Sequence, residues 1–125
     1  MVYKAKADRL ERMAYHNAGR TGLKLPAVSL GLWHQFGDAY PAENVTKEAV
    51  TKARRLNELA KERGQSLPQM ALAWLLKDDR VTSVLIGASR KQQIEENVQV
   101  LHAPIFSREE LSMIEAVLNE KNEGE

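Results

Sequence analysis

One stretch of the chain decides the fold, and it reads Val84-Leu85-Ile86-Gly87-Ala88-Ser89-Arg90-Lys91-Gln92. The run from Val81 to Ile86 has the length and the β-branched content of a buried strand. Gly87 and Ala88 allow a tight exit from that strand, and the box from Ser89 to Gln92 predicts the start of a helix. A strand that passes through a glycine into a capped helix favours an α/β fold.

Two helices are predicted before this stretch. The first runs from a cap at Thr46 to a stop at Gly64, with apolar residues at helical spacing. The second opens with the capping box Ser66-Leu67-Pro68-Gln69. Its predicted buried face consists of Leu67, Met70, Ala71, Trp74 and Leu75.

Two helices are also predicted from Ser89 onward. The third helix of the chain turns Ile94, Val98 and Leu101 inward, and Ser107-Arg108-Glu109-Glu110 caps a fourth. The inward face of this fourth helix is predicted to carry Leu111, Ile114 and Leu118.

The amino-terminal part predicts a hairpin followed by a strand. Turn residues fill Asn17 to Gly22. Pro26 confines the alternating run Leu23-Lys24-Leu25 to the edge of a sheet. Val28 to Trp33 is typical of a mostly buried strand. The predicted order is therefore hairpin, strand, two helices, strand, two helices, which is an α/β arrangement.

Composition excludes several classes of function. The 125 residues are 43% hydrophobic and 28% charged, as expected for one soluble domain with one core. A net charge of +1 gives no strong field for a nucleic-acid backbone, and no stretch is apolar enough to span a membrane. Because cysteine is absent, we expect no disulfide and no thiolate chemistry, and a cytoplasmic location.

The start of the third helix is the candidate site that the residues themselves suggest. The helix dipole favours acidic residues in a first turn, yet this helix opens with Arg90 and Lys91. A phosphate docked there would meet both cations, the Ser89 hydroxyl and unpaired backbone N–H groups. The alternative is that both basic residues are simply solvated. Gln93, Glu96 and Asn97 lie on a neighbouring face, where they either reach a base or ribose or are ordinary surface residues.

Other polar and aromatic residues are weaker candidates. His16, His34 and His102 have no spacing that favours a metal site or a catalytic dyad. The pair Asp78-Asp79 lies between two basic residues at a helix end, which favours a solvated turn over paired catalytic carboxylates. Trp33, with nearby Phe36, either stacks on a ligand or closes the core.

Three segments resemble parts of the aldo-keto reductase barrel. Val84 to Asn97 is similar to its last strand and helix, in the branch that includes voltage-gated potassium-channel β subunits and bacterial methylglyoxal reductases. Gly64 to Leu76 resembles the preceding helix, and Asn17 to Gly37 resembles the bottom cap and first strand.

The resemblance implies a partial (β/α)8 TIM barrel in which the middle of the barrel is missing. The chain is then one incomplete domain, 1–125, with the hairpin and first strand in 1–44 and the late helices and last strand in 45–125. Full-length relatives of this kind reduce aldehydes or ketones with NADPH, so the implied cofactor is NADP(H) and the implied substrate is a small carbonyl compound.

The resemblance also assigns cofactor-binding residues. Ser89 and Arg90 are implied to hold the 2′-phosphate, Gln93, Glu96 and Asn97 to lie on the adenine side, and Trp33 to border the nicotinamide. The full predicted set is Trp33, Gly87, Ala88, Ser89, Arg90, Gln93, Glu96 and Asn97.

The catalytic residues of the family are not matched. Its tetrad of Asp, Tyr, Lys and His lies after the second strand, on the third and after the fourth, whereas this chain passes near Asn44 directly into a late helix. Neither Tyr40 nor His34 has the context of a catalytic residue. We therefore expect no catalytic residue and no activity of this chain alone. The alternatives are an interaction module without a ligand, and an enzyme completed by a separate barrel portion.

Topology adds an expectation about assembly. In a closed barrel the first and last strands are neighbours, and joining them directly by one helical crossover gives a disfavoured left-handed connection. Two unpaired strand edges also invite another chain. We expect a homo-oligomer, a strand-swapped assembly, or a longer parent protein.

Overall fold

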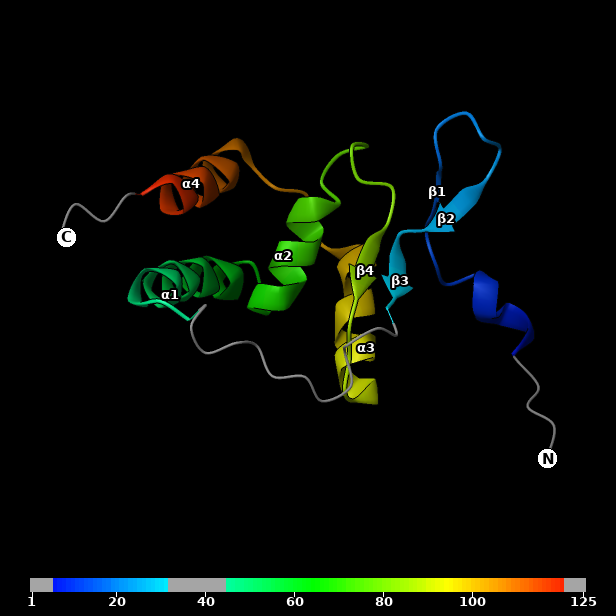
Figure 1. The fold of residues 1–125 in the computed structure, drawn as a ribbon, viewed down its shortest axis with the longest axis horizontal. Helices are drawn as coiled ribbons and strands as arrows, with labels where there is room; N and C mark the ends of the chain where they lie inside the picture. Colours follow the sequence, from blue (N-terminus) through cyan, green and yellow to red (C-terminus); the bar gives the residue numbers. More distant parts are fainter. Residues whose placement is uncertain (1–5, 32–44, 121–125) are drawn as a thin grey trace.

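The computed structural model describes residues 6–31 and 45–120. Its elements, labelled in Figure 1, are η1 (Ala7–Leu10), β1 (Tyr15–Asn17), β2 (Lys24–Pro26), β3 (Val28–Leu30), α1 (Lys47–Glu62), α2 (Leu67–Leu75), β4 (Val84–Ile86), α3 (Lys91–Val98), η3 (Gln99–His102) and α4 (Arg108–Asn119). The predicted α/β order is confirmed.

The predicted hairpin is formed by β1 and β2. The two strands are antiparallel, with Tyr15 opposite Pro26 and Asn17 opposite Lys24. Gly19 and Gly22 take positive φ angles of 58° and 78° in the connecting loop, a backbone conformation that glycine adopts without steric cost. These glycines explain why the turn forms where the sequence predicts it.

The strand after the hairpin pairs with the late strand. β3 and β4 are parallel, with Val28 opposite Val84 and Leu30 opposite Ile86. The pair is extended by Val84 N–H donating to Ala27 O (2.9 Å) and Gly31 N–H donating to Ile86 O (2.8 Å). β3 and β4, which stand for the first and last strands of the predicted barrel, are therefore neighbours within one chain.

The expected partial barrel is only partly supported. The described strands form two separate two-stranded sheets, and the residues that the structure describes contain no closed barrel. Strand β4 is shorter than the predicted run because residues 81–83 lie in a loop before it. The part of the predicted first strand beyond Gly31, including Trp33, lies outside the described residues.

The predicted helix caps at Thr46, Ser66 and Ser107 are confirmed. Each side-chain oxygen accepts the backbone N–H three residues later, at 3.1, 3.3 and 3.1 Å. In α2 and α4 the capping box is reciprocal, because the side-chain oxygen of the third helical residue accepts the backbone N–H of the cap residue.

Helix α2 is the centre of the molecule, and its buried face differs from the predicted one. It lies between the β3–β4 sheet and the α1/α4 pair (Figure 1). Ala73 packs with the sheet residues, whereas Met70 packs with residues of α1 and α4. The helix thus buries two faces instead of one. Ala71 and Leu75 fall between these faces and are exposed, so their predicted burial is wrong.

The inward faces of the last two helical segments also need correction. Leu101 packs against the sheet cluster from η3, after α3 has ended. In α4, Ile114 is buried as predicted, but Leu118 is exposed and Val117 is buried. A 3.6-residue period places such a face only to within about one position.

Arg63 connects the end of α1 to the start of α4. Its side chain is 3% exposed. The guanidinium donates to Glu110 Oε2 (2.6 Å), Pro104 O (2.6 Å) and Gln65 Oε1 (2.9 Å). It also lies 3.8 Å from the centroid of the Phe106 ring. The buried charge is therefore fully partnered, as burial of an arginine requires.

The partner carboxylate of Arg63 has a lowered pKa. The largest cause is the hydrogen bond that Glu110 accepts from the Ser107 N–H, and the Arg63 guanidinium lowers the pKa of Glu110 further, while burial opposes both. A carboxylate with a lowered folded pKa stabilises the protein above its unfolded pKa, and this contribution is lost as the pH falls through the folded value.

Arg63→Met is expected to lower the free energy of unfolding by about 2 kcal/mol at neutral pH, because it leaves Glu110 without its cation. Urea unfolding followed by circular dichroism measures the loss, with Arg54→Met on the exposed face of α1 as control. The difference from wild type should shrink in acid, as the pH falls through the lowered pKa of Glu110 and its carboxylate is protonated. A loss no larger than that of Arg54→Met would contradict the assigned role.

Candidate functional site

The predicted site lies at the carboxyl ends of the two parallel strands. Strand β4 ends at Ile86, and Gly87 to Arg90 lead directly into α3. Gly31, at the end of β3, lies against this exit through its hydrogen bond to Ile86 O. A Cβ on Gly31 would lie 3.2 Å from Leu85 Cδ2 and 3.6 Å from Ile86 O. Ligands of parallel α/β sheets bind at this end of the strands.

The helix begins one residue later than predicted. The cap is Arg90 and the helix starts at Lys91, so the third helical residue is Gln93 rather than Gln92. The reason is the Gln93 side chain, whose Oε1 accepts the Ser89 N–H (2.8 Å), the Ser89 hydroxyl (3.2 Å) and the Arg90 N–H (3.2 Å). Arginine has no acceptor atom, so this cap is formed from the Gln93 side only.

The donors on Gln93 Oε1 are the ones that the sequence assigns to a phosphate. An amide oxygen has two lone pairs, and here it faces three donors. The side chain therefore gathers the unpaired N–H groups of the helix start around one weak acceptor. A charged oxygen in the same place would form stronger hydrogen bonds.

The two basic residues at the helix start differ in their surroundings. Lys91 pairs with Glu95 (3.1 Å) on the open surface. Arg90 is exposed, and its guanidinium has no hydrogen-bond or ion-pair partner within the described residues. The first turn carries no acidic residue. The positive end of the helix dipole and the Arg90 charge thus face solvent together.

The other predicted residues lie on or beside α3. Gly87 is half-buried and Ala88 is buried, and together they form the connection from β4 to the start of α3. Glu96 is exposed and its carboxylate accepts the Gln92 side chain (3.0 Å), while Asn97 is half-buried one residue further on. The structure therefore brings Gly87, Ala88, Ser89, Arg90, Gln93, Glu96 and Asn97 onto one strand–turn–helix unit. Their role in cofactor binding stays a prediction.

Gln69 is a residue near this site that the sequence reasoning placed only in the α2 cap. Its Nε2 donates to the Glu96 carbonyl (2.7 Å) and to Gln99 Oε1 (3.3 Å). The capping box identified Gln69 as a helix-start residue, but no local pattern shows which distant carbonyl its free amide hydrogens reach.

The remaining polar candidates have structural partners. Asp78 pairs with Arg80 (2.5 Å), and hydrogen bonds from Arg80 hold the pKa of the Asp78 carboxyl well below its usual range in an exposed turn. His16 contacts the Thr82 carbonyl through Nδ1 (2.8 Å). His34 lies outside the described residues. The described part of the chain contains no group of three His, Cys, Asp or Glu residues that could hold a metal.

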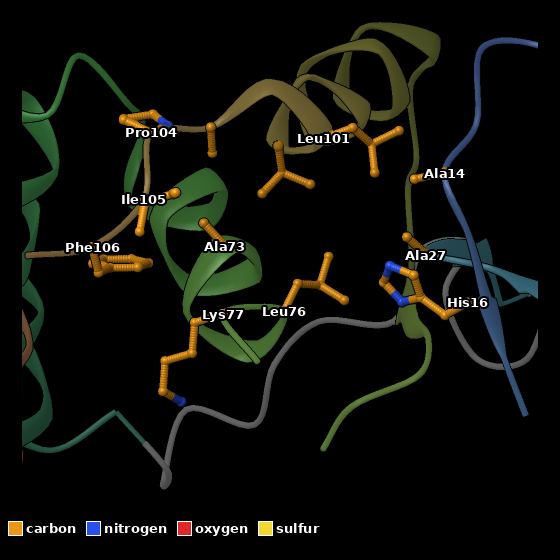
Figure 2. A pocket seen from close by; sticks show the side chains of 12 residues that line it. Ala14, His16, Ala27, Ala73, Leu76, Lys77, Leu101, Pro104, Ile105 and Phe106 are labelled. Carbon is orange, nitrogen blue, oxygen red and sulfur yellow. The ribbon is translucent and has the colours of Figure 1, made fainter. Parts of the chain in front are cut away.

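A cavity of about 240 Å³ lies elsewhere, between the hairpin, α2 and the segment after η3. Figure 2 shows its mostly apolar lining, with His16 and Lys77 as the side chains that carry charge or titrate. His16 is bonded to Thr82, and Lys77 donates to Trp74 O (3.2 Å) and stacks on the Trp74 ring. This cavity borders Ala27, which precedes β3, and is therefore separate from the strand exit at Ile86.

No helix of the described residues combines the length and the apolar character needed to cross a membrane.

A model of the aldo/keto reductase family matches residues 5–119. The match covers most of the chain and includes both strands of the candidate site. The chain therefore belongs to the aldo/keto reductase family, as its resemblance predicted.

Individual relatives match over shorter stretches. The chain is 61% identical to an L-glyceraldehyde 3-phosphate reductase of Escherichia coli (strain K12) over 71 residues, which are 57% of the chain and 20% of the relative. It is 35% identical to a probable voltage-gated potassium channel subunit beta of Oryza sativa subsp. japonica over 79 residues, 62% of the chain and 24% of the relative. The matched part thus spans about a fifth to a quarter of these relatives.

Gln93→Leu is expected to raise the hydrogen-exchange rates of the Ser89 and Arg90 amides about fivefold, because a lost helix cap costs about 1 kcal/mol. Exchange measured by NMR at neutral pH checks this. Gln92→Leu is the control, since the Gln92 amide bonds to the Glu96 side chain and not to the cap. Unchanged exchange in Gln93→Leu would show that its side chain does not cap the helix.

Proposed function

We propose that this chain retains a binding site for the 2′-phosphate and adenine of NADP(H). Longer members of its family use this cofactor to reduce aldehydes and ketones. The observation that carries the proposal is the start of α3. There the exposed Arg90, which has no side-chain partner among residues 6–31 and 45–120, adjoins three donors gathered on the Gln93 amide oxygen. A phosphate there would replace a neutral acceptor by a charged one.

The proposal assigns a role to each part of the helix start. The planar guanidinium of Arg90 donates hydrogen bonds to two phosphate oxygens, and the Ser89 hydroxyl and backbone N–H groups bind the remaining oxygens. When phosphate takes these donors, the Gln93 amide is released toward the adenine side. Glu96 and Asn97 continue the same face of α3 and are proposed to contact the base or ribose.

For the reaction, we propose that this chain alone does not reduce a carbonyl compound. The family reaction needs a proton donor beside the carbonyl and a positioned substrate, and the tetrad that supplies them in the family has no match in this sequence. The name of the Escherichia coli relative supports a small aldehyde as the substrate class of the longer proteins. NADP(H), when bound, would supply the hydride.

NADPH titrated into the purified chain is expected to change its own fluorescence. Arg90→Ala should weaken NADPH binding about tenfold and change NADH binding little, because the arginine pairs with the 2′-phosphate. Arg108→Ala is the matched control, since Arg108 is an exposed arginine at the start of α4. No response at millimolar NADPH would remove the binding proposal. Equal losses for NADPH and NADH would remove the phosphate assignment.

A second candidate function is self-association without a ligand. β3 and β4 pair only with each other in the described residues, so each has a second edge without a strand. Leu85 is 74% exposed and Leu30 is 44% exposed on this small sheet. Unpaired edges and exposed apolar residues favour the addition of strands from another copy.

If this surface joins two copies, Leu85→Lys is expected to lower the dimerisation constant at least about tenfold, because a buried charge opposes association. Sedimentation velocity over a concentration series measures this, with Ile105→Lys as control at a 95% exposed residue away from the sheet. A wild-type chain that is monomeric at all concentrations would contradict the interaction proposal.

A further inference from the structure

Helix α3 carries the proposed nucleotide-binding residues, yet apolar burial holds it only weakly. None of its eight residues is buried. Ile94 and Val98 are half-buried, and the remaining residues are polar or charged. A helix of two turns is marginal by itself in water. Its place in the structure therefore depends on specific contacts at its ends.

The amide of Gln69 is bonded through both its oxygen and its nitrogen. Its Oε1 accepts the Ser66 N–H (3.0 Å) and so completes the cap of α2. Its Nε2 donates to the Glu96 carbonyl (2.7 Å) and to Gln99 Oε1 (3.3 Å). Glu96 belongs to the last turn of α3, where carbonyl groups lack partners within the helix. One side chain thus joins the start of α2 to the end of α3.

We infer that Gln69 is a positioning residue for the nucleotide site, an inference that rests on the proposed function. Gln69 is not proposed to contact the nucleotide itself. Its bond to the Glu96 backbone sets where the Glu96 side chain begins, and Gln93 lies one turn before it on the same helix. Because α2 packs on both sides through Met70 and Ala73, it gives Gln69 a rigid base from which to hold α3.

The two roles of Gln69 are separated by a pair of substitutions. Gln69→Glu keeps an acceptor for the Ser66 N–H and still forms a capping box, but its carboxylate cannot donate to the Glu96 carbonyl. Ser66→Ala does the reverse, because it removes the Ser66 hydroxyl from the cap and leaves the Gln69 amide in place. A purely structural role in capping α2 predicts that Ser66→Ala is the more harmful change.

The experiment uses adenosine 2′,5′-bisphosphate, which carries the adenine and the 2′-phosphate without the nicotinamide. Isothermal titration at neutral pH is expected to show binding about fivefold to tenfold weaker for Gln69→Glu than for wild type, because the hydrogen bonds from Gln69 to Glu96 and Gln99 are lost. Ser66→Ala should bind within about twofold of wild type. Equal binding by wild type and Gln69→Glu would overturn the inference and leave the proposed function intact.

Amide hydrogen exchange without any ligand supplies the second readout. Gln69→Glu is expected to speed exchange in residues 94–98 of α3 more than in α2, and Ser66→Ala to do so at the start of α2. Slower or unchanged exchange in α3 would overturn the positioning role even if binding falls. A wild-type chain that does not bind the bisphosphate overturns the proposed function, and with it the role of Gln69 in nucleotide binding.

Discussion

The buried guanidinium of Arg63 is the contact on which the helical half of this structure depends. It ends α1, satisfies the Pro104 carbonyl ahead of α4 and pairs with Glu110 inside the α4 capping box. Phe106 covers it and also packs against both apolar clusters. A charge removed from water must have partners on every side, so this one position fixes the chain path from η3 to α4.

Helix α2 connects the α1/α4 pair to the strands. Its Met70 face packs on the α1/α4 pair, and its Ala73 face packs on β3 and β4 (Figure 1). A helix that is apolar nearly all round needs cover on more than one side. The turn at Gly87, directly after β4, therefore rests on packed helices, although the part of its sheet that the structure describes has only two strands.

The candidate site differs from this base because hydrogen bonds hold α3 at both ends, while none of the eight residues of α3 is buried. Gln93 closes the start of α3, and Gln69 binds the carbonyl of Glu96 near its end. Such an element is easily reorganised, since a ligand can replace one hydrogen-bond partner by another without opening a core. This property suits a helix whose first turn is proposed to exchange an internal amide for a phosphate.

The sequence by itself determined the α/β order, the hairpin turn at Gly19 and Gly22, the caps at Thr46, Ser66 and Ser107, and the family. These features are local, because each depends on residues within one turn or one strand. Only the tertiary structure decided that α2 buries two faces and exposes Leu75, and that Arg63 and Gln69 hold distant segments. Arg63 and its partner Glu110 lie 47 residues apart, and Gln69 and Glu96 lie 27 residues apart, so which donor meets which acceptor depends on packing that no short pattern encodes.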